Sequence, residues 1–312
     1  MPNLHDIERR INSVTSTKQI TRTMEMVAAA KIRRATDRVF NALPWANCIS
    51  DMLISTAKYA PLDSEPLLVT HDEVKRAVVV VITSDRGLAG GFNSNVLREA
   101  EKLIKAKEKQ GISVDVIACG KKAIGYFTYR GIKPIFEFRD LSADPTYEEA
   151  AEISAYIGDG YHIGGEKGVI DEVTIVFNHA KNGAEQTLIT QQVLPINMMS
   201  FADVLGLEPK EEDVLEPYRD DEKKIPGDVD FEPDAATVMH QLMVAYLRNT
   251  FYYALIDSAA AEQGARRTAM KSATDNATEM AETLTRLYNR VRQGAITTEI
   301  SEIVGGAAAL ED

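Results

Sequence analysis

Glycine and proline are absent from long stretches at both ends of this chain, which limits what the ends can form. Between Pro2 and Pro44 there is neither residue, and after Pro233 there is no proline and only four glycines. These breakers concentrate in the middle of the sequence instead. Both ends are therefore predicted to be long helices. The first is expected to kink near Pro44 and to stop before Pro61.

The carboxy-terminal end carries an apolar repeat with alternating steps of four and three residues. Thirteen of its seventeen positions are apolar, over eight heptads. A 3.5-residue period of this length is typical of a coiled-coil seam, and it predicts one helix of roughly 70 residues, or about 105 Å. Several shorter helices packed as a bundle are the alternative. The repeat consists of Val238, Leu242, Ala245, Asn249, Tyr252, Ile256, Ala259, Gln263, Arg266, Met270, Ala273, Ala277, Met280, Leu284, Leu287, Val291 and Gly294.

The amino-terminal end can supply the partner helix. It has two apolar stripes with different phases, which predicts a stutter between them. The first stripe is Leu4, Ile7, Ile11 and Val14, and the second is Ile20, Met24 and Val27. The predicted fold is thus a long antiparallel coiled coil of the N- and C-terminal helices plus a central Rossmann-like α/β domain.

The central segment alternates predicted strands with predicted helices, which indicates a largely parallel sheet covered by helices. The last two strands are expected to form a hairpin. Strands are predicted at 76–83, 112–119, 133–138, 171–178 and 186–194, and helices at 93–110, 121–131 and 146–157. By sequence the chain divides into a first helix (1–60), the α/β domain (75–195), an acidic linker (205–233) and a last helix with an apolar tip (234–312).

Charge and cysteine usage limit the possible partners and compartment. The net charge is −12, which argues against a nucleic-acid binder. Residues 205–234 contribute 12 acidic and 4 basic residues to it, a net −8. Two distant cysteines, no apolar signal core and no run long enough to span a bilayer favour a cytoplasmic protein without a transmembrane segment.

The loop "SDRGLAGGFNSN" lies between a predicted strand and a predicted helix, where a phosphate-binding loop would lie. Its G-x-x-G-G spacing fits neither a dinucleotide fingerprint nor a Walker loop, and Phe92 would crowd a phosphate. We therefore expect the glycines to allow a tight turn with positive φ, and Asn93 or Ser94 to cap the helix. Histidines and acidic clusters in metal-ligand or catalytic spacing are also missing, so no catalytic site, metal or cofactor is predicted.

Antiparallel pairing of the two end helices would leave the last two dozen residues without a partner. The end of this segment, "IVGGAAAL", is apolar, and exposed apolar surface is typical of a binding surface. A frayed tail is the other interpretation.

Four motifs resemble the gamma subunit of the F-type ATP synthase, and together the resemblance covers nearly the whole chain. They are "ITTEISEIVGGAAA" (296–309), "RRINSVTSTKQITRTMEMVAAAKIRRA" (9–35), "ITSDRGLAGGFN" (82–93) and "EQGARRTAMKSATDNA" (262–277). The family implies a non-catalytic rotor at the cytoplasmic face of the cell membrane. Its implied partners are a ring of alpha and beta subunits, the epsilon subunit and the membrane c-ring.

The resemblance also implies roles for individual residues. Arg9, Arg10, Arg33 and Arg34 are candidates for contact with acidic loops of the beta subunits. Contact with the ring is expected from Met24, Arg266, Arg292, Gln293, Thr297 and Glu299. An apolar tip is expected from Ile303, Val304, Ala307, Ala308, Ala309 and Leu310. Two other classes stay open on the residues alone: a Rossmann-like nucleotide-binding enzyme with helical appendages, and a coiled-coil scaffold or tether.

Overall fold

A computed structural model describes residues 4–57, 59–60, 65–71, 73–162, 169–196 and 230–311. Its contacts divide the chain into two compact units. Unit 1 combines residues 1–30 with 266–312, and unit 2 is the segment 31–265. The boundaries between the units fall inside two long helices, so each helix contributes to both. Most of the predicted acidic linker lies outside the described residues.

The two end helices are continuous, as their lack of breakers predicts. α1 (Leu4–Thr56) has 53 residues and contains Pro44, whose side chain is exposed. α6 (Ala235–Glu311) has 77 residues. Asp234 caps its start by accepting hydrogen bonds from the backbone and the hydroxyl of Thr237, at 2.9 and 2.8 Å. These bonds lower the pKa of Asp234, because they favour the ionised carboxylate.

Unit 2 contains a five-stranded sheet in the order β3-β2-β1-β4-β5. β1 pairs in parallel with β2 and β4, β2 pairs in parallel with β3, and β5 closes an antiparallel hairpin with β4. The prediction of a largely parallel sheet ending in a hairpin is confirmed. The elements are η2 (Pro66–Leu68), β1 (Arg76–Ile82), α2 (Phe92–Lys109), β2 (Ser113–Cys119), α3 (Lys121–Tyr129), β3 (Phe136–Phe138), α4 (Tyr147–His162), β4 (Glu172–His179) and β5 (Thr187–Leu194).

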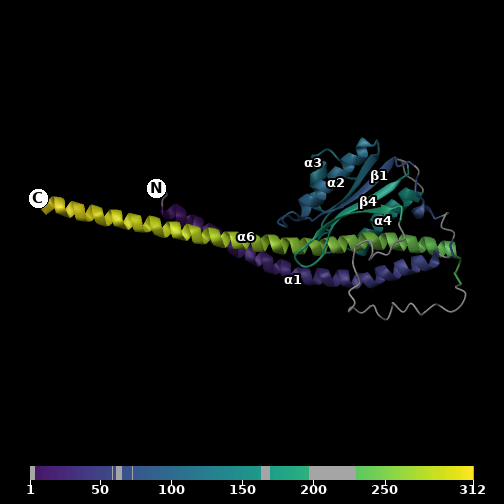
Figure 1. Cartoon of the computed structure of the whole chain (residues 1–312), viewed down its shortest axis with the longest axis horizontal. Coiled ribbons are helices and arrows are strands. Elements are labelled where there is room, and N and C mark those ends of the chain that lie inside the picture. Colours follow the sequence, from purple (N-terminus) through teal and green to yellow (C-terminus); the bar gives the residue numbers. More distant parts are fainter. Residues whose placement is uncertain are drawn as a thin grey trace. The chain divides into compact units, whose positions relative to one another are not determined.

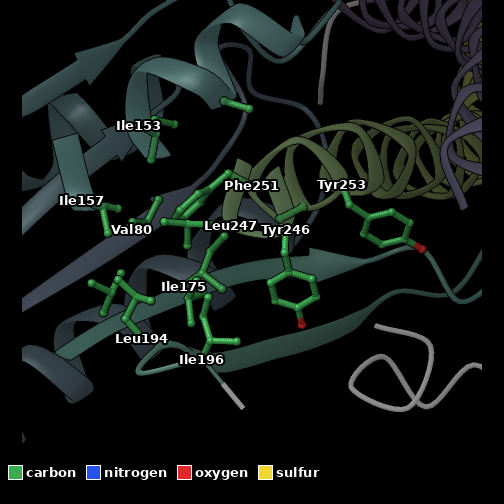
Figure 2. Packing of buried hydrophobic residues seen from close by; sticks show 14 of the residues in the cluster. Val80, Ile153, Ile157, Ile175, Leu194, Ile196, Tyr246, Leu247, Phe251 and Tyr253 are labelled. Atoms are coloured by element: carbon green, nitrogen blue, oxygen red, sulfur yellow. The ribbon is translucent and has the colours of Figure 1, made fainter. Parts of the chain in front are cut away.

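Every residue of β1 is buried, because helices cover both faces of the sheet. Val79 and Val81 pack with the apolar sides of α2 and α3 on one face. Val78 and Val80 face the opposite way and join a larger cluster with α4 and the unit 2 parts of α1 and α6. Figure 2 shows Leu247 and Phe251 of α6 pointing into this cluster beside Val80 and Ile175. This part of α6 therefore contributes side chains to the core of the α/β domain.

In unit 1 the first part of α1 lies antiparallel beside α6, and α6 continues past the start of α1 (Figure 1). One contact fixes their register: the hydroxyl of Thr274 hydrogen-bonds that of Thr21 at 2.8 Å, with both residues buried. The predicted coiled-coil pairing is confirmed here. On α1 the less exposed positions follow one unbroken heptad pattern, so the predicted stutter is wrong. These positions are Leu4, Ile7, Ile11, Val14, Lys18, Thr21, Glu25 and Ala28, with Met24 also partly buried. Ile20 and Val27 of the predicted second stripe are 58% and 52% exposed.

The predicted seam on α6 is wrong at Met280 and Leu287, in unit 1. Met280 and Leu287 are 56% and 38% exposed, whereas their neighbours Ala281 and Tyr288 are less exposed. The observed seam consists of Met270, Thr274, Ala277, Ala281, Leu284, Tyr288 and Val291. The apolarity of Met280 and Leu287 favoured the wrong phase. Thr274, Ala277 and Ala281 of this seam are small, which allows the two helices to approach closely there.

Candidate functional site

The glycine-rich loop after β1 forms a tight turn, but only one of its glycines uses the left-handed region. Gly90 has a φ of 58°, and the non-glycine residue Leu88 has a φ of 64°. Asn93 and Ser94 do not cap α2, which corrects the prediction. Gly91 occupies the cap position without a side-chain bond, and Asn93 instead accepts the backbone N–H of Ser84 at 2.9 Å. The loop is thus tied back to the strand that precedes it.

Asp85 of this loop binds backbone groups at the ends of two other strands. Its carboxylate accepts backbone N–H groups of Lys121, Asp140 and Ser142, each at 3.0 Å. These donors follow β2 and β3, so one side chain joins the ends of three neighbouring strands. Partial burial opposes the ionisation of Asp85, but the three hydrogen bonds outweigh it and lower the pKa of the carboxyl group. An anion already occupies this edge of the sheet.

Phe92 does not line a phosphate site, because it is buried against α6. Its side chain is 1% exposed and packs with Ala89, Ala261 and Ala265. The carbonyl of Phe92 accepts a hydrogen bond from Nδ2 of Asn178 on β4, at 3.0 Å. The loop therefore links β1 and β4 to the surface of α6 within unit 2.

A buried ion pair that the sequence analysis missed lies next to this contact. Asp257 of α6 has a side chain that is 1% exposed, and its Oδ2 lies 2.7 Å from Nδ1 of His179 at the end of β4. Its Oδ1 accepts the backbone N–H of Ala180 at 3.1 Å. The hydrogen bond to Asp257 raises the pKa of His179. One signal was available: Asp257 is the only charged residue between Arg248 and Glu262.

The six residues expected to contact the ring fall into two groups. Met24 and Arg266 lie on the paired part of unit 1, where Met24 is partly exposed and Arg266 is buried. The other four lie on the part of α6 beyond this pairing, and all four are exposed. They are Arg292, Gln293, Thr297 and Glu299. Exposure alone does not test whether these residues bind another subunit, so their role in binding stays a prediction.

The end of α6 exposes apolar side chains. Ile296, Ile300, Ile303 and Val304 are 47%, 56%, 66% and 62% exposed. Every residue from Arg292 to Val304 is exposed, and continuing the seam from Val291 in heptad steps reaches Ala295, Thr298 and Glu302 rather than the isoleucines. The apolar stripe therefore faces a different direction from the seam. The predicted tip residues Ala307, Ala308, Ala309 and Leu310 lie beyond the last described side chain.

Four arginines of α1 are also exposed. Arg9 pairs with Asp6 of its own helix at 3.1 Å, and the side chains of Arg10, Arg33 and Arg34 are exposed as well. Surface pairs of this kind contribute little stability. These side chains are therefore accessible to an acidic surface.

Over the described ranges, His, Cys, Asp and Glu side chains do not gather in threes as metal ligands would. No helix in the described part of the chain combines the length and hydropathy that crossing a bilayer requires.

Comparison with known proteins agrees with this architecture. A family model described as "ATP synthase" matches residues 3–310. The ATP synthase gamma chain of Heliobacterium modesticaldum is 41% identical over 99% of this chain and 100% of its own length. That of Streptomyces coelicolor is 37% identical over 98% and 95% of the two chains.

Solved structures have the same fold. A chain of the Euglena gracilis mitochondrial ATP synthase (OSCP/F1/c-ring) superposes with a TM-score of 0.62 at 18% identity, covering 98% of this chain and 94% of that one. A chain of the central stalk and c-ring of the Tetrahymena thermophila mitochondrial ATP synthase superposes with a TM-score of 0.55 at 24% identity, covering 81% and 99%. From the family match, the full-length relatives and the paired helices around one α/β domain, the chain belongs to the ATP synthase gamma chain family.

Proposed function

We propose that this gamma chain is the rotating central shaft of a proton-translocating F-type ATP synthase. It transmits rotation of the membrane c-ring to a ring of alpha and beta subunits and so controls the ATPase activity of that ring. Unit 1 enters the ring, and the α/β domain of unit 2 contacts the epsilon subunit and the c-ring at the cytoplasmic face of the cell membrane. Catalysis belongs to the ring, and the chain itself is non-catalytic.

The observation that carries this proposal is the unpartnered end of α6. From Arg292 to Val304 every side chain is exposed, and four large apolar ones face away from the seam direction. A helix that presents apolar residues without a partner in its own chain requires a partner elsewhere. An apolar collar in the alpha and beta ring would cover this tip, and apolar contacts have few directional bonds to break as the shaft turns.

The polar residues below the tip would then contact the ring at particular angles. Arg292, Gln293, Thr297 and Glu299 are exposed on the same unpaired segment, so all four are accessible to a surrounding ring. Met24 and Arg266 would contact the ring further from the tip, on the paired part of unit 1. The exposed arginines Arg9, Arg10, Arg33 and Arg34 would meet acidic loops of the beta subunits.

Reconstitution tests the proposal. The chain is combined with alpha, beta and epsilon subunits and with c-ring-containing vesicles, and ATP-driven proton uptake is measured. Uptake that requires this chain is the expected result, and equal uptake in its absence overturns the proposal. Equilibrium dialysis of the isolated chain against ATP and NAD is the parallel assay. Micromolar binding there would favour the nucleotide-binding enzyme instead.

The tip is tested in the same vesicles with a matched pair of variants. Ile303→Asn places an amide on the apolar stripe, whereas Ser301→Asn replaces one exposed polar residue by another. The first variant is expected to slow ATP-driven uptake, because the amide loses its hydration inside an apolar collar. Equal rates in the two variants would contradict the apolar collar.

A further inference from the structure

The α/β domain contacts one face of α6 through four consecutive positions of a helical stripe. Asp257, Ala261, Gly264 and Ala265 follow the spacing i, i+4, i+7 and i+8, which places them on the same side of the helix. All four are buried within unit 2. Three of them are alanine or glycine, so the sheet can approach the helix backbone closely.

Three parts of the α/β domain contact this stripe: the end of β4, the loop after β1 and the tip of the β4–β5 hairpin. The end of β4 contacts Asp257, through Nδ1 of His179 at 2.7 Å and the backbone N–H of Ala180 at 3.1 Å. Phe92, from the loop after β1, packs on Ala261 and Ala265.

The tip of the β4–β5 hairpin meets the same stripe one turn further along. A Cβ atom added at Gly264 would lie 3.4 Å from the carbonyl oxygen of Gly183. That separation is an ordinary van der Waals contact, so the hairpin tip lies directly against the helix at this position.

Hydrogen bonds connect these sheet contacts to one another. β1 and β4 are neighbouring parallel strands, and Asn178 of β4 donates a hydrogen bond to the carbonyl of Phe92. The Phe92 loop, the end of β4 and the hairpin therefore move together. A force applied to the sheet reaches α6 at all of these contacts at once.

We infer that this sheet–helix joint, formed by Phe92, His179, Ala180 and Gly183 on the stripe from Asp257 to Ala265, is where the α/β domain turns the shaft. The inference rests on the proposed rotor function. It assigns Asp257 as the positioning residue of the joint. The apolar contacts of the joint are non-directional, whereas its hydrogen bonds have a preferred geometry. The paired carboxylate resists rotation of α6 about its own axis, because two donors hold both of its oxygens.

Burial of the pair supports a role beyond ordinary packing. The Asp257 side chain is 1% exposed and that of His179 is 10% exposed. Replacing a buried ion pair with apolar residues of similar size is often neutral or stabilising, so such a pair is weak support for a role in stability alone. The pair adds two directional hydrogen bonds to the apolar packing between the sheet and α6.

The experiment measures coupling under load in the reconstituted complex. ATP-driven proton uptake is followed to its steady-state gradient, and ATP hydrolysis is measured separately with an uncoupler present. Asp257→Ala removes both acceptors. Asp257→Asn keeps one carbonyl for the N–H of Ala180. Asp159→Ala removes an exposed carboxylate of α4 and is the matched control.

The expected result is a graded loss of the steady-state gradient. Asp257→Ala should reach the lowest gradient, Asp257→Asn an intermediate one, and Asp159→Ala the wild-type value, all with unchanged uncoupled hydrolysis. Thermal unfolding of each isolated chain is measured in parallel. A purely structural role would lower the unfolding midpoint of the Asp257 variants but leave the gradient of assembled complexes unchanged, and that outcome overturns the inference.

The remaining outcomes are also decisive. If Asp257→Ala does not assemble, the comparison of Asp257→Asn with the wild type decides, and equal gradients overturn the joint. If the wild-type chain itself supports no ATP-driven uptake, the proposed rotor function fails, and that result is distinct from failure of the joint alone.

Discussion

Replacing Phe92 with alanine tests whether the glycine-rich loop serves as an anchor on α6. Phe92 is 1% exposed, and its neighbours across the contact are the short side chains of Ala261 and Ala265. Because these alanines belong to a continuous helix, neither can move to fill the space. The hydrogen bond from Asn178 to the backbone carbonyl of Phe92 remains in the variant. The loss is therefore one of packing alone.

The expected loss of unfolding free energy is about 3–5 kcal/mol, the range for removing a buried phenyl ring. Hydrogen exchange measured by mass spectrometry locates this loss. Amides of α6 around Ala261, and of β4, should exchange about 10²- to 4 × 10³-fold faster, since each 1.4 kcal/mol corresponds to a factor of ten. Urea unfolding followed by circular dichroism gives the global value.

The same loop supplies the control. Leu88 lies four residues away and is 62% exposed, so Leu88→Ala should change stability by less than about 0.5 kcal/mol. If Phe92→Ala and Leu88→Ala destabilise the chain equally, or if the added exchange is confined to the loop, the anchoring role is refuted. A Phe92→Leu variant gives the same comparison if the alanine variant does not fold.

Three further predictions concern the seam and the buried pair. Met280→Gln should change stability by less than about 0.5 kcal/mol, whereas Ala281→Gln should lower it by about 1–3 kcal/mol through overpacking. Thermal unfolding of the two variants checks this. A larger loss in Met280→Gln would mean that Met280, and not Ala281, faces α1. Thr21→Val and Thr274→Val should show a coupling of about 0.5–1.5 kcal/mol in a double-mutant cycle, and additivity would mean that the hydroxyls do not interact. The folded pKa of His179 is raised above its usual 6.5, so its contribution is complete below pH 6.5 and is lost as pH rises through the folded pKa. The stability difference between wild type and Asp257→Asn should therefore shrink with rising pH in urea titrations, and a difference that grows would contradict the sign.

The fold was predictable wherever a period extended over many residues. The strand–helix alternation located every strand of the sheet, and the missing breakers predicted both long helices. The phase of the α6 seam was not predictable, because Met280 and Ala281 are both apolar and adjacent. Apolarity favoured methionine, but the approach of α1 favours the smaller side chain. Only the position of the facing helix distinguishes them, and sequence periodicity does not contain that information.

The contacts between the sheet and α6 were less accessible to sequence reasoning. Asp257 and His179 are 78 residues apart, and neither belongs to a local motif. Asp85 likewise accepts bonds from Lys121, Asp140 and Ser142, which only the order of the strands brings together. The spacing of the loop glycines matched neither phosphate-binding motif. It did not reveal that Phe92 packs on a helix more than 160 residues later in the chain.

Unit 1 is formed by two segments far apart in the sequence, and this affects how it folds during synthesis. Thr21 bonds Thr274 across 253 residues of sequence, and the unit joins residues 1–30 to the segment that begins at Arg266. A ribosome adds about 5–20 residues per second, so roughly 12–50 s separate the synthesis of the two halves. Unit 2 is contiguous, but its core includes α6 residues as far as Leu255, so it is complete only near the end of that interval. The first 30 residues emerge with their apolar stripe uncovered and must stay free of aggregation until their partner is translated, which makes this stripe a target for chaperones that bind nascent chains.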